Sequence, residues 1–279
     1  MGILNNCFLE AISKTIEESG VDLTEEEIED IAAKAVQEAL PKVIEDIHRE
    51  LHRDAPEMLF WRRRFGRGFR ERLLHRWQAG FDLLEMLGVI CLETGEIIVR
   101  DTPQGLDESE RPRFEALMRL HARACLTFEE IVCLLKNGYA DGALARWRAL
   151  HEIATVAMFI AESPVEVSIR FLEHRHIECW GRMQKYQEYS ERCGFPPYSK
   201  EEMDNAKAVA ESLKERHGKG YEGDYGWATI SVQGSKPTFA EIESRVGVDH
   251  LRPYYKWACE RIHASCNGLY RTLGLMNEE

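Results

Sequence analysis

The sequence predicts an all-α protein, an antiparallel helical bundle with an N-terminal helical extension. Apolar residues recur at the helical spacing of three and four positions along most of the chain. Four long segments of this kind follow a polar linker, and the connections between the first three are short. Short connections favour antiparallel neighbours, so we expect the first three to pack side by side and the last to complete the bundle.

The N-terminal extension is expected to cover residues 1–110. Thr24 and Glu27 have the spacing of a capping box, which starts the first strong helix. Pro41 is expected to bend or break this helix, because proline lacks the amide proton for an intrahelical hydrogen bond. A further helix is predicted over residues 67–92.

Two features mark the end of the extension. Residues 91–99 read CLETGEIIV, a Thr-Gly turn between apolar residues, and a small β-hairpin is expected there. Residues 100–113 are polar and contain two prolines and a glycine, which is typical of a linker. We therefore expect the bundle domain to cover residues 111–279.

Six helices are predicted in the bundle domain, with a glycine-rich loop between the fourth and the fifth. They cover residues 112–136, 139–162, 164–192, 199–216, 238–245 and 249–273.

Composition restricts the class of protein. A net charge of −12 argues against nucleic-acid binding over the whole surface, although a local basic site remains compatible with it. The eight cysteines form no C-x-x-C pair and no zinc spacing, so we expect reduced thiols in a cytoplasmic protein. No membrane span, signal peptide, metal site or cofactor motif is indicated, and neither ATP hydrolysis nor proteolysis is supported.

The segment 138–161 is the most informative part of the chain. It is apolar in nearly all directions, which predicts a central helix, yet four ionisable residues lie in its middle: Arg146, Arg148, His151 and Glu152. Charges in a core must be paired or functional. At about 100° per residue, Arg148, His151 and Glu152 share one face of the helix.

Two interpretations of that face stay open. Arg148 and Glu152 have the i, i+4 spacing of a structural salt bridge. Alternatively, the same side chains form a catalytic site, which His263 would join, since it lies on a stripe of the last helix that faces the interior.

Several separated motifs resemble a known family. They are G-x3-G-A-x4-R-x3-E at 138–152, R-F-x2-H at 170–174, Trp227, V-G-V at 246–248 and Y-x3-C-x3-H at 255–263. In order and spacing this set is similar to the 5677 family of prokaryotic domains of unknown function, over roughly residues 112–272. Cys259 stands where the family usually has a small hydroxyl residue, which would alter any hydrogen bond made there.

The bundle of that family resembles the higher eukaryotes and prokaryotes nucleotide-binding (HEPN) proteins, many of which cleave RNA in defence or as toxins. Their motif is Arg, four to six residues, then His, and Arg146 and His151 have this interval. The resemblance implies metal-independent RNA cleavage, with His as the base for the 2'-hydroxyl and Arg stabilising the charge on the phosphorane.

An arginine-rich segment at residues 61–77 stands out in this acidic chain. We select five of its arginines as candidate RNA contacts, Arg62, Arg63, Arg64, Arg67 and Arg70. Phe65 and Phe69 lie between them, and arginine with interleaved aromatic residues suits phosphate contacts and base stacking. The same residues suit an acidic protein surface, including this protein's own residues 25–50.

Two functional hypotheses follow. The first is a HEPN-like effector, dimeric, that cleaves or binds RNA in phage defence or toxin action. The second is a non-enzymatic interaction and assembly module whose polar core is structural. The partners are accordingly expected to be a second copy or another protein, with RNA under the first hypothesis.

Overall fold

The computed structural model describes residues 25–102, 105–232 and 236–262. All regular elements in these ranges are α-helices or short 3-10 helices, and no strand occurs among them. The predicted all-α class is confirmed for the described part of the chain.

The chain divides into two compact units, residues 1–72 and 73–279. The helix α2 (Glu25–Asp101) contributes to both. Of the bend or break predicted at Pro41, the break does not occur, because α2 continues through Pro41 and through Pro56. The φ angle to which proline is restricted is close to that of a helix, so the chain can accept the loss of one hydrogen bond without leaving the helical conformation. Within α2 the residue with non-helical angles is Trp77, with φ −114° and ψ 17°, where two helical segments meet.

The predicted hairpin at residues 91–99 is also wrong, since these residues form the last turns of α2. This part of α2 packs against α3 (Arg111–Lys136): the ring of His121 lies 3.0 Å, Nε2 to O, from the carbonyl of Cys91. A side chain at Gly95 would meet that ring at 2.6 Å, so this glycine permits a close helix contact and makes no turn.

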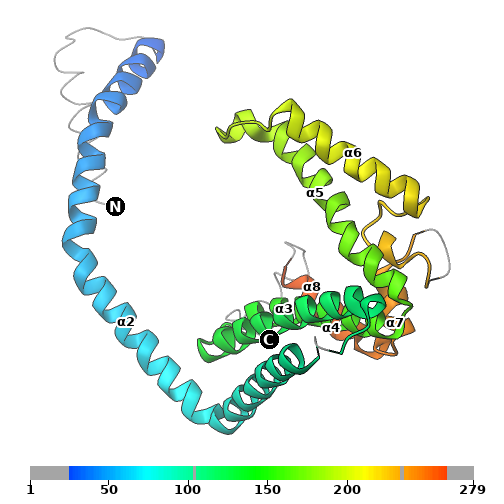
Figure 1. Cartoon of the computed structure of the whole chain (residues 1–279). Coiled ribbons are helices and arrows are strands. Elements are labelled where there is room, and N and C mark those ends of the chain that lie inside the picture. The colour runs from blue at the N-terminus through cyan, green and yellow to red at the C-terminus, as the bar shows by residue number, and fades with distance from the viewer. Residues whose placement is uncertain (1–24, 103–104, 233–235, 263–279) are drawn as a thin grey trace. The chain divides into compact units, whose positions relative to one another are not determined.

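The second unit contains the other helices, which Figure 1 labels. After α3 they are α4 (Ala140–Glu162), α5 (Val165–Cys193), α6 (Lys200–His217), α7 (Phe239–Arg245) and α8 (Arg252–Glu260). Three 3-10 helices accompany them, η1 (Glu108–Glu110), η2 (Gly226–Ala228) and η3 (Asp249–Leu251). The predicted boundaries of α3 to α7 are confirmed to within a residue or two. The last predicted helix extends beyond residue 262 and so partly lies outside the described residues.

Two antiparallel hairpins organise this unit, and in Figure 1 the partners of each lie side by side. The first joins α3 and α4 through a connection in which Gly138 takes a left-handed φ of 82°. The second joins α5 and α6: Gly194 ends α5 with φ 69°, and Ser199 begins α6 with a capping box. Glycine is favoured where a helix ends because it adopts a positive φ without steric strain. Serine is favoured where a helix begins because its hydroxyl accepts a hydrogen bond from a backbone amide of the first turn.

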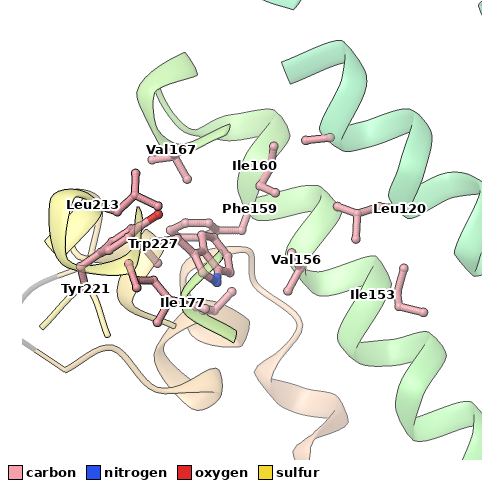
Figure 2. Packing of buried hydrophobic residues seen from close by; sticks show 14 residues of the cluster. Leu120, Ile153, Val156, Phe159, Ile160, Val167, Ile177, Leu213, Tyr221 and Trp227 are labelled. Atoms are coloured by element: carbon pink, nitrogen blue, oxygen red, sulfur yellow. The ribbon is translucent and has the colours of Figure 1, made fainter. Parts of the chain in front are cut away.

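The hydrophobic core lies where α4 meets the start of α5 and the loop that follows α6. Phe159 and Ile160 of α4 are fully buried, and Phe159 points toward Trp227 (Figure 2). Leu120 approaches α4 from the opposite side, on α3. The prediction that α4 is a central helix therefore holds, and its ionisable residues lie close to the core.

Candidate functional site

One polar cluster links α4 to α8 and is called here the Arg148 cluster. Arg148 and Glu152 form an ion pair, 3.0 Å from Nη2 to Oε1. The hydroxyl of Tyr255 lies between them: it donates to Glu152 Oε1 at 2.6 Å and accepts from Arg148 Nη2 at 3.1 Å. The guanidinium also lies over the Tyr255 ring, 5.0 Å from its centre. This geometry ties two positions of α4, one turn apart, to a helix about a hundred residues further along the chain.

Burial and these contacts set the protonation of the cluster. Burial, and then the hydrogen bond to Glu152, raise the pKa of Tyr255 to about 12. Burial by itself lowers the pKa of Arg148, but the hydrogen bond to Tyr255 and the charge of Glu152 outweigh it, so that this pKa is raised. At neutral pH Tyr255 is therefore a proton donor and Arg148 a fixed cation.

A second cluster lies deeper and is called here the His151 cluster. His151 Nε2 donates to Glu243 Oε1 at 2.7 Å, and Arg252 Nη2 lies 2.5 Å from the other oxygen, Oε2. Glu243 has no exposed surface, and His151 is 7% exposed. A carboxylate in such a place must have partners to offset its lost hydration, and here α4 and the start of α8 supply one each.

Aromatic rings enclose the His151 cluster. Trp147 stacks on the His151 imidazole at 5.3 Å between ring centres, and Phe239 meets it edge-on at 5.8 Å. Arg252 lies over the rings of Phe239 and Tyr255. The packing fixes the orientation of the imidazole. Glu243 bonds to its Nε2 atom, and the rings of Trp147 and Phe239 lie against it.

The two clusters therefore differ in access. The side chains of Arg148 and Glu152 are 25% and 32% exposed, whereas those of His151 and Glu243 are nearly or fully enclosed. A general base must reach a substrate proton directly or through one water molecule. In this structure Glu243 engages Nε2 of His151, and the rings of Trp147 and Phe239 lie against the imidazole, so a substrate could reach only the other nitrogen, Nδ1, of an enclosed ring. The arrangement suits the locking of α4, α7 and α8 together better than it suits proton transfer.

The structure separates Arg146 from His151. Arg146 pairs with Glu130 and contacts Thr127, both on α3, whereas His151 turns to α7. Five residues along a helix correspond to about 140° around its axis, so the two side chains serve different neighbours. By contrast Arg148, His151 and Glu152 do lie together, as their shared face predicts. His263 lies outside the described residues.

Glu243 and Arg252 were missed by sequence analysis. Glu243 lies in the short acidic run AEIESR, where nothing distinguishes it from the exposed Glu241. Arg252 directly precedes Pro253 at the start of α8, again without a marker. A buried ionisable group on α4 implies that partners exist, but it does not say which of many surface-type residues supply them.

A third polar group holds the loop between α6 and η2. Arg170 is buried and donates to the carbonyls of Gly226, Trp227 and His217 and to the hydroxyl of Thr229. One turn along α5, His174 Nε2 donates to two carbonyls of the same loop. Arg170 and His174 are both buried and lie one turn apart on α5. Their partners are backbone oxygens, so these two residues define the loop.

The part of α2 in the first unit, residues 25–72, is called here the arm, and it is unlike the bundle. Ten large apolar side chains of the arm are more than 39% exposed, and eight of them share one side of the helix: Val36, Leu40, Ile44, Ile47, Leu51, Met58, Phe65 and Phe69. At about 100° per residue, all eight fall within an arc of roughly 80°, which we call the arm stripe. Leu51 and Phe65, at 60% and 71%, are among the most exposed.

Five arginines of the arm form no ion pair with a described residue. Arg62, Arg63, Arg64, Arg67 and Arg70 are all exposed. The ion pairs that the structure shows along the described part of α2 use Arg49, Arg53 and Arg100, and none uses one of these five. Arg64 lies over the ring of Trp61, at 5.5 Å. The five arginines predicted to contact RNA are therefore available to a binding partner, since no described residue forms an ion pair with them.

The described residues show neither a metal-binding group nor a membrane-spanning helix. There, no three His, Cys, Asp or Glu side chains are grouped so that they could hold a metal ion. Among the helices that the structure describes, none combines the length and the apolar character needed to cross a membrane.

The described helices from α3 onward, with their polar clusters, define a helical-bundle protein. A family model matches residues 114–279, more than half of the chain, and its description is "Family of unknown function (DUF5677)". The chain belongs to this family. No curated protein and no solved structure matches it.

Proposed function

We propose that this protein is a non-enzymatic assembly module: the arm binds another protein chain, and the polar clusters of the bundle hold the fold. The observation that carries the proposal is the arm stripe. Its eight exposed apolar side chains extend over about 50 Å of helix at 1.5 Å per residue. Contiguous apolar surface of this kind is typical of an interface, because its exposure to water is unfavourable.

The bundle supports the proposal because its candidate catalytic residues are engaged by other side chains of the fold. Arg148, His151 and Glu152 are each engaged by Tyr255 or Glu243, and the rings around His151 shield it from solvent. A family of unknown function supplies no reaction for these residues. RNA cleavage by Arg146 and His151, as the HEPN resemblance implies, stays a prediction.

A mass-spectrometric cross-linking experiment tests the proposal. The tagged full chain is cross-linked in extract from its native cells, and the linked peptides are identified. We expect links to another chain that map to the arm, and we expect Leu51→Asp with Phe65→Asp to remove them. His151→Gln and Arg148→Met, at matched folded fraction, should keep them. Links that survive in the arm variant, or that vanish in a folded His151→Gln protein, would reject the proposal.

RNA is a second candidate for the arm, favoured by one observation. Exposed aromatic rings alternate with the exposed arginines, an arrangement that allows stacking on bases together with phosphate contacts. Fluorescence anisotropy with single-stranded RNA tests it. RNA binding predicts an affinity that falls steeply between about 50 and 200 mM salt. It also predicts loss of binding when Arg62, Arg63 and Arg64 are replaced by Gln.

A further inference from the structure

We infer that the partner of the arm is a second copy of the same arm, paired in antiparallel orientation about a midpoint between residues 52 and 53. The inference rests on the proposed function and names its partner. It comes from a symmetry of the arm stripe and from the net charge of each half of the arm.

Six of the eight apolar positions of the stripe pair with one another about this midpoint, whereas Ile44 lies opposite Trp61 and Leu51 opposite Asp54. An antiparallel second copy in this register lies with Val36 opposite Phe69, Leu40 opposite Phe65 and Ile47 opposite Met58. The three pairs share one midpoint, and each side chain in them is exposed in the single chain. The aromatic side chains of one end meet aliphatic ones of the other, so that large residues face smaller ones, as close packing requires. The same surface serves both copies, as in a two-fold symmetric interface.

Charge selects the antiparallel orientation. Residues 25–50 contain nine Asp or Glu and three Lys or Arg, whereas residues 58–72 contain six Arg and one Glu. A parallel pair would lay acidic beside acidic and basic beside basic. An antiparallel pair lays each acidic half beside a basic half, which favours association and excludes the wrong orientation.

The charges act through the net charge of each half of the arm and not through ion pairs across the seam. At about 100° per residue, Glu38, Glu45, Arg63 and Arg70 lie roughly 120–160° from the centre of the arm stripe, on the outer face of α2. Near the midpoint, Arg53 pairs with Glu50 and Asp54 within its own helix.

A charge variant of the full chain tests the inference, with molar mass measured by light scattering. The wild type is expected to be a dimer. Arg63→Glu with Arg70→Glu changes the net charge of residues 58–72 from +5 to +1 and should raise the dimer Kd about tenfold at low salt, and less at high salt. An unchanged Kd at low salt would overturn the claim that charge selects the antiparallel orientation.

Cysteine cross-linking tests the register. Chains with Leu40→Cys are mixed with chains with Phe65→Cys under mild oxidation, and linked peptides are identified by mass spectrometry. We expect the 40–65 link between chains and no 40–40 link, because an antiparallel pair separates the two copies of position 40 by about 37 Å. A 40–40 link would show parallel pairing and overturn the inference.

Other outcomes separate this inference from the proposed function. A monomeric wild type overturns self-pairing; the proposed function then stands only if the cross-linking in extract shows an arm-bound partner. A dimer that Leu51→Asp with Phe65→Asp leaves intact assembles through another surface and overturns both. If the wild type is a monomer and binds RNA with steep salt dependence, the arm is an RNA contact and self-pairing is rejected.

Discussion

The bundle and the arm carry charge in opposite ways. In the bundle, buried or half-buried ions meet partners from other helices: Arg148 meets Tyr255, and Glu243 meets His151 and Arg252. In the arm, arginines and large apolar side chains lie together on the surface without such partners. Buried charge is costly unless it is paired, so its partners are part of the fold. Exposed charge beside exposed apolar surface costs the fold little and is available for binding.

This comparison predicts that substitutions in the bundle reduce stability, whereas those in the arm reduce association. It also shows why ionisable residues in a central helix are an ambiguous signal. The charges of α4 do lie close to the core, as their sequence context predicts, but each is paired with a side chain of its own helix or of a neighbouring one, as in a structural ion pair.

The largest effect is expected at Glu243. Glu243→Gln removes the charge opposite Arg252 and should lower the free energy of unfolding by about 4 kcal/mol, since breaking a buried pair leaves an uncompensated ion. Urea unfolding followed by circular dichroism measures it. Glu191→Gln, an exposed position on α5, is the matched control and should stay close to the wild type. A loss below about 1 kcal/mol would show that the His151 cluster does not hold α7 to α4.

The next effect is expected at Arg170. Arg170→Met removes the donor that fixes the loop before and around η2 and should cost about 3 kcal/mol, because several buried carbonyls lose their hydrogen bond. Arg175→Met, exposed on the same helix, should cost less than about 0.5 kcal/mol. Equal losses in the same unfolding assay would contradict the assignment of Arg170 to the loop.

A smaller effect is expected at Tyr255. Tyr255→Phe keeps the ring but removes the hydroxyl that joins Arg148 to Glu152, at a cost of about 1.5 kcal/mol. Tyr254→Phe, at an exposed neighbouring position, is the control. If both variants unfold at the same urea concentration as the wild type, the Arg148 cluster contributes nothing to stability.

The pH dependence sharpens this test. The pKa of Tyr255 is raised from 10.0 to about 12 in the folded protein. Up to pH 10 the hydroxyl is protonated in both states, so its contribution is fully present. Above pH 10 the unfolded chain loses this proton first, and the contribution falls until the pH passes about 12. The stability difference between wild type and Tyr255→Phe should therefore shrink over this range, as alkaline unfolding curves can show. A constant difference would contradict the shift.

The sequence predicts the helices of the bundle well because their ends carry local signals. Gly138 and Gly194 end helices, and Ser199 begins one through a capping box. It also predicts the pairing of Arg148 with Glu152, which depends only on helical spacing. Local signals mislead at Pro41 and at residues 91–99, where the helix continues.

The site was less predictable than the helices. Glu243 and Arg252 reach α4 from segments about a hundred residues away, and no local pattern marks them. The separation of Arg146 from His151 follows from helix geometry, but the partners on α3 and α7 that engage each of them depend on tertiary packing. The symmetry of the arm stripe is present in the sequence, and the exposure of α2 in the structure reveals that these positions need a partner.

The most direct test of this account compares two exposed phenylalanines. Phe65 lies on the arm stripe, and Phe195 lies in the connection between α5 and α6. Light scattering of the full chain should give the same assembled mass for wild type and Phe195→Asp, and a monomer mass for Phe65→Asp, with the bundle folded in all three. An unchanged mass in Phe65→Asp, or a monomer in Phe195→Asp, would contradict the claim that the arm is the binding element.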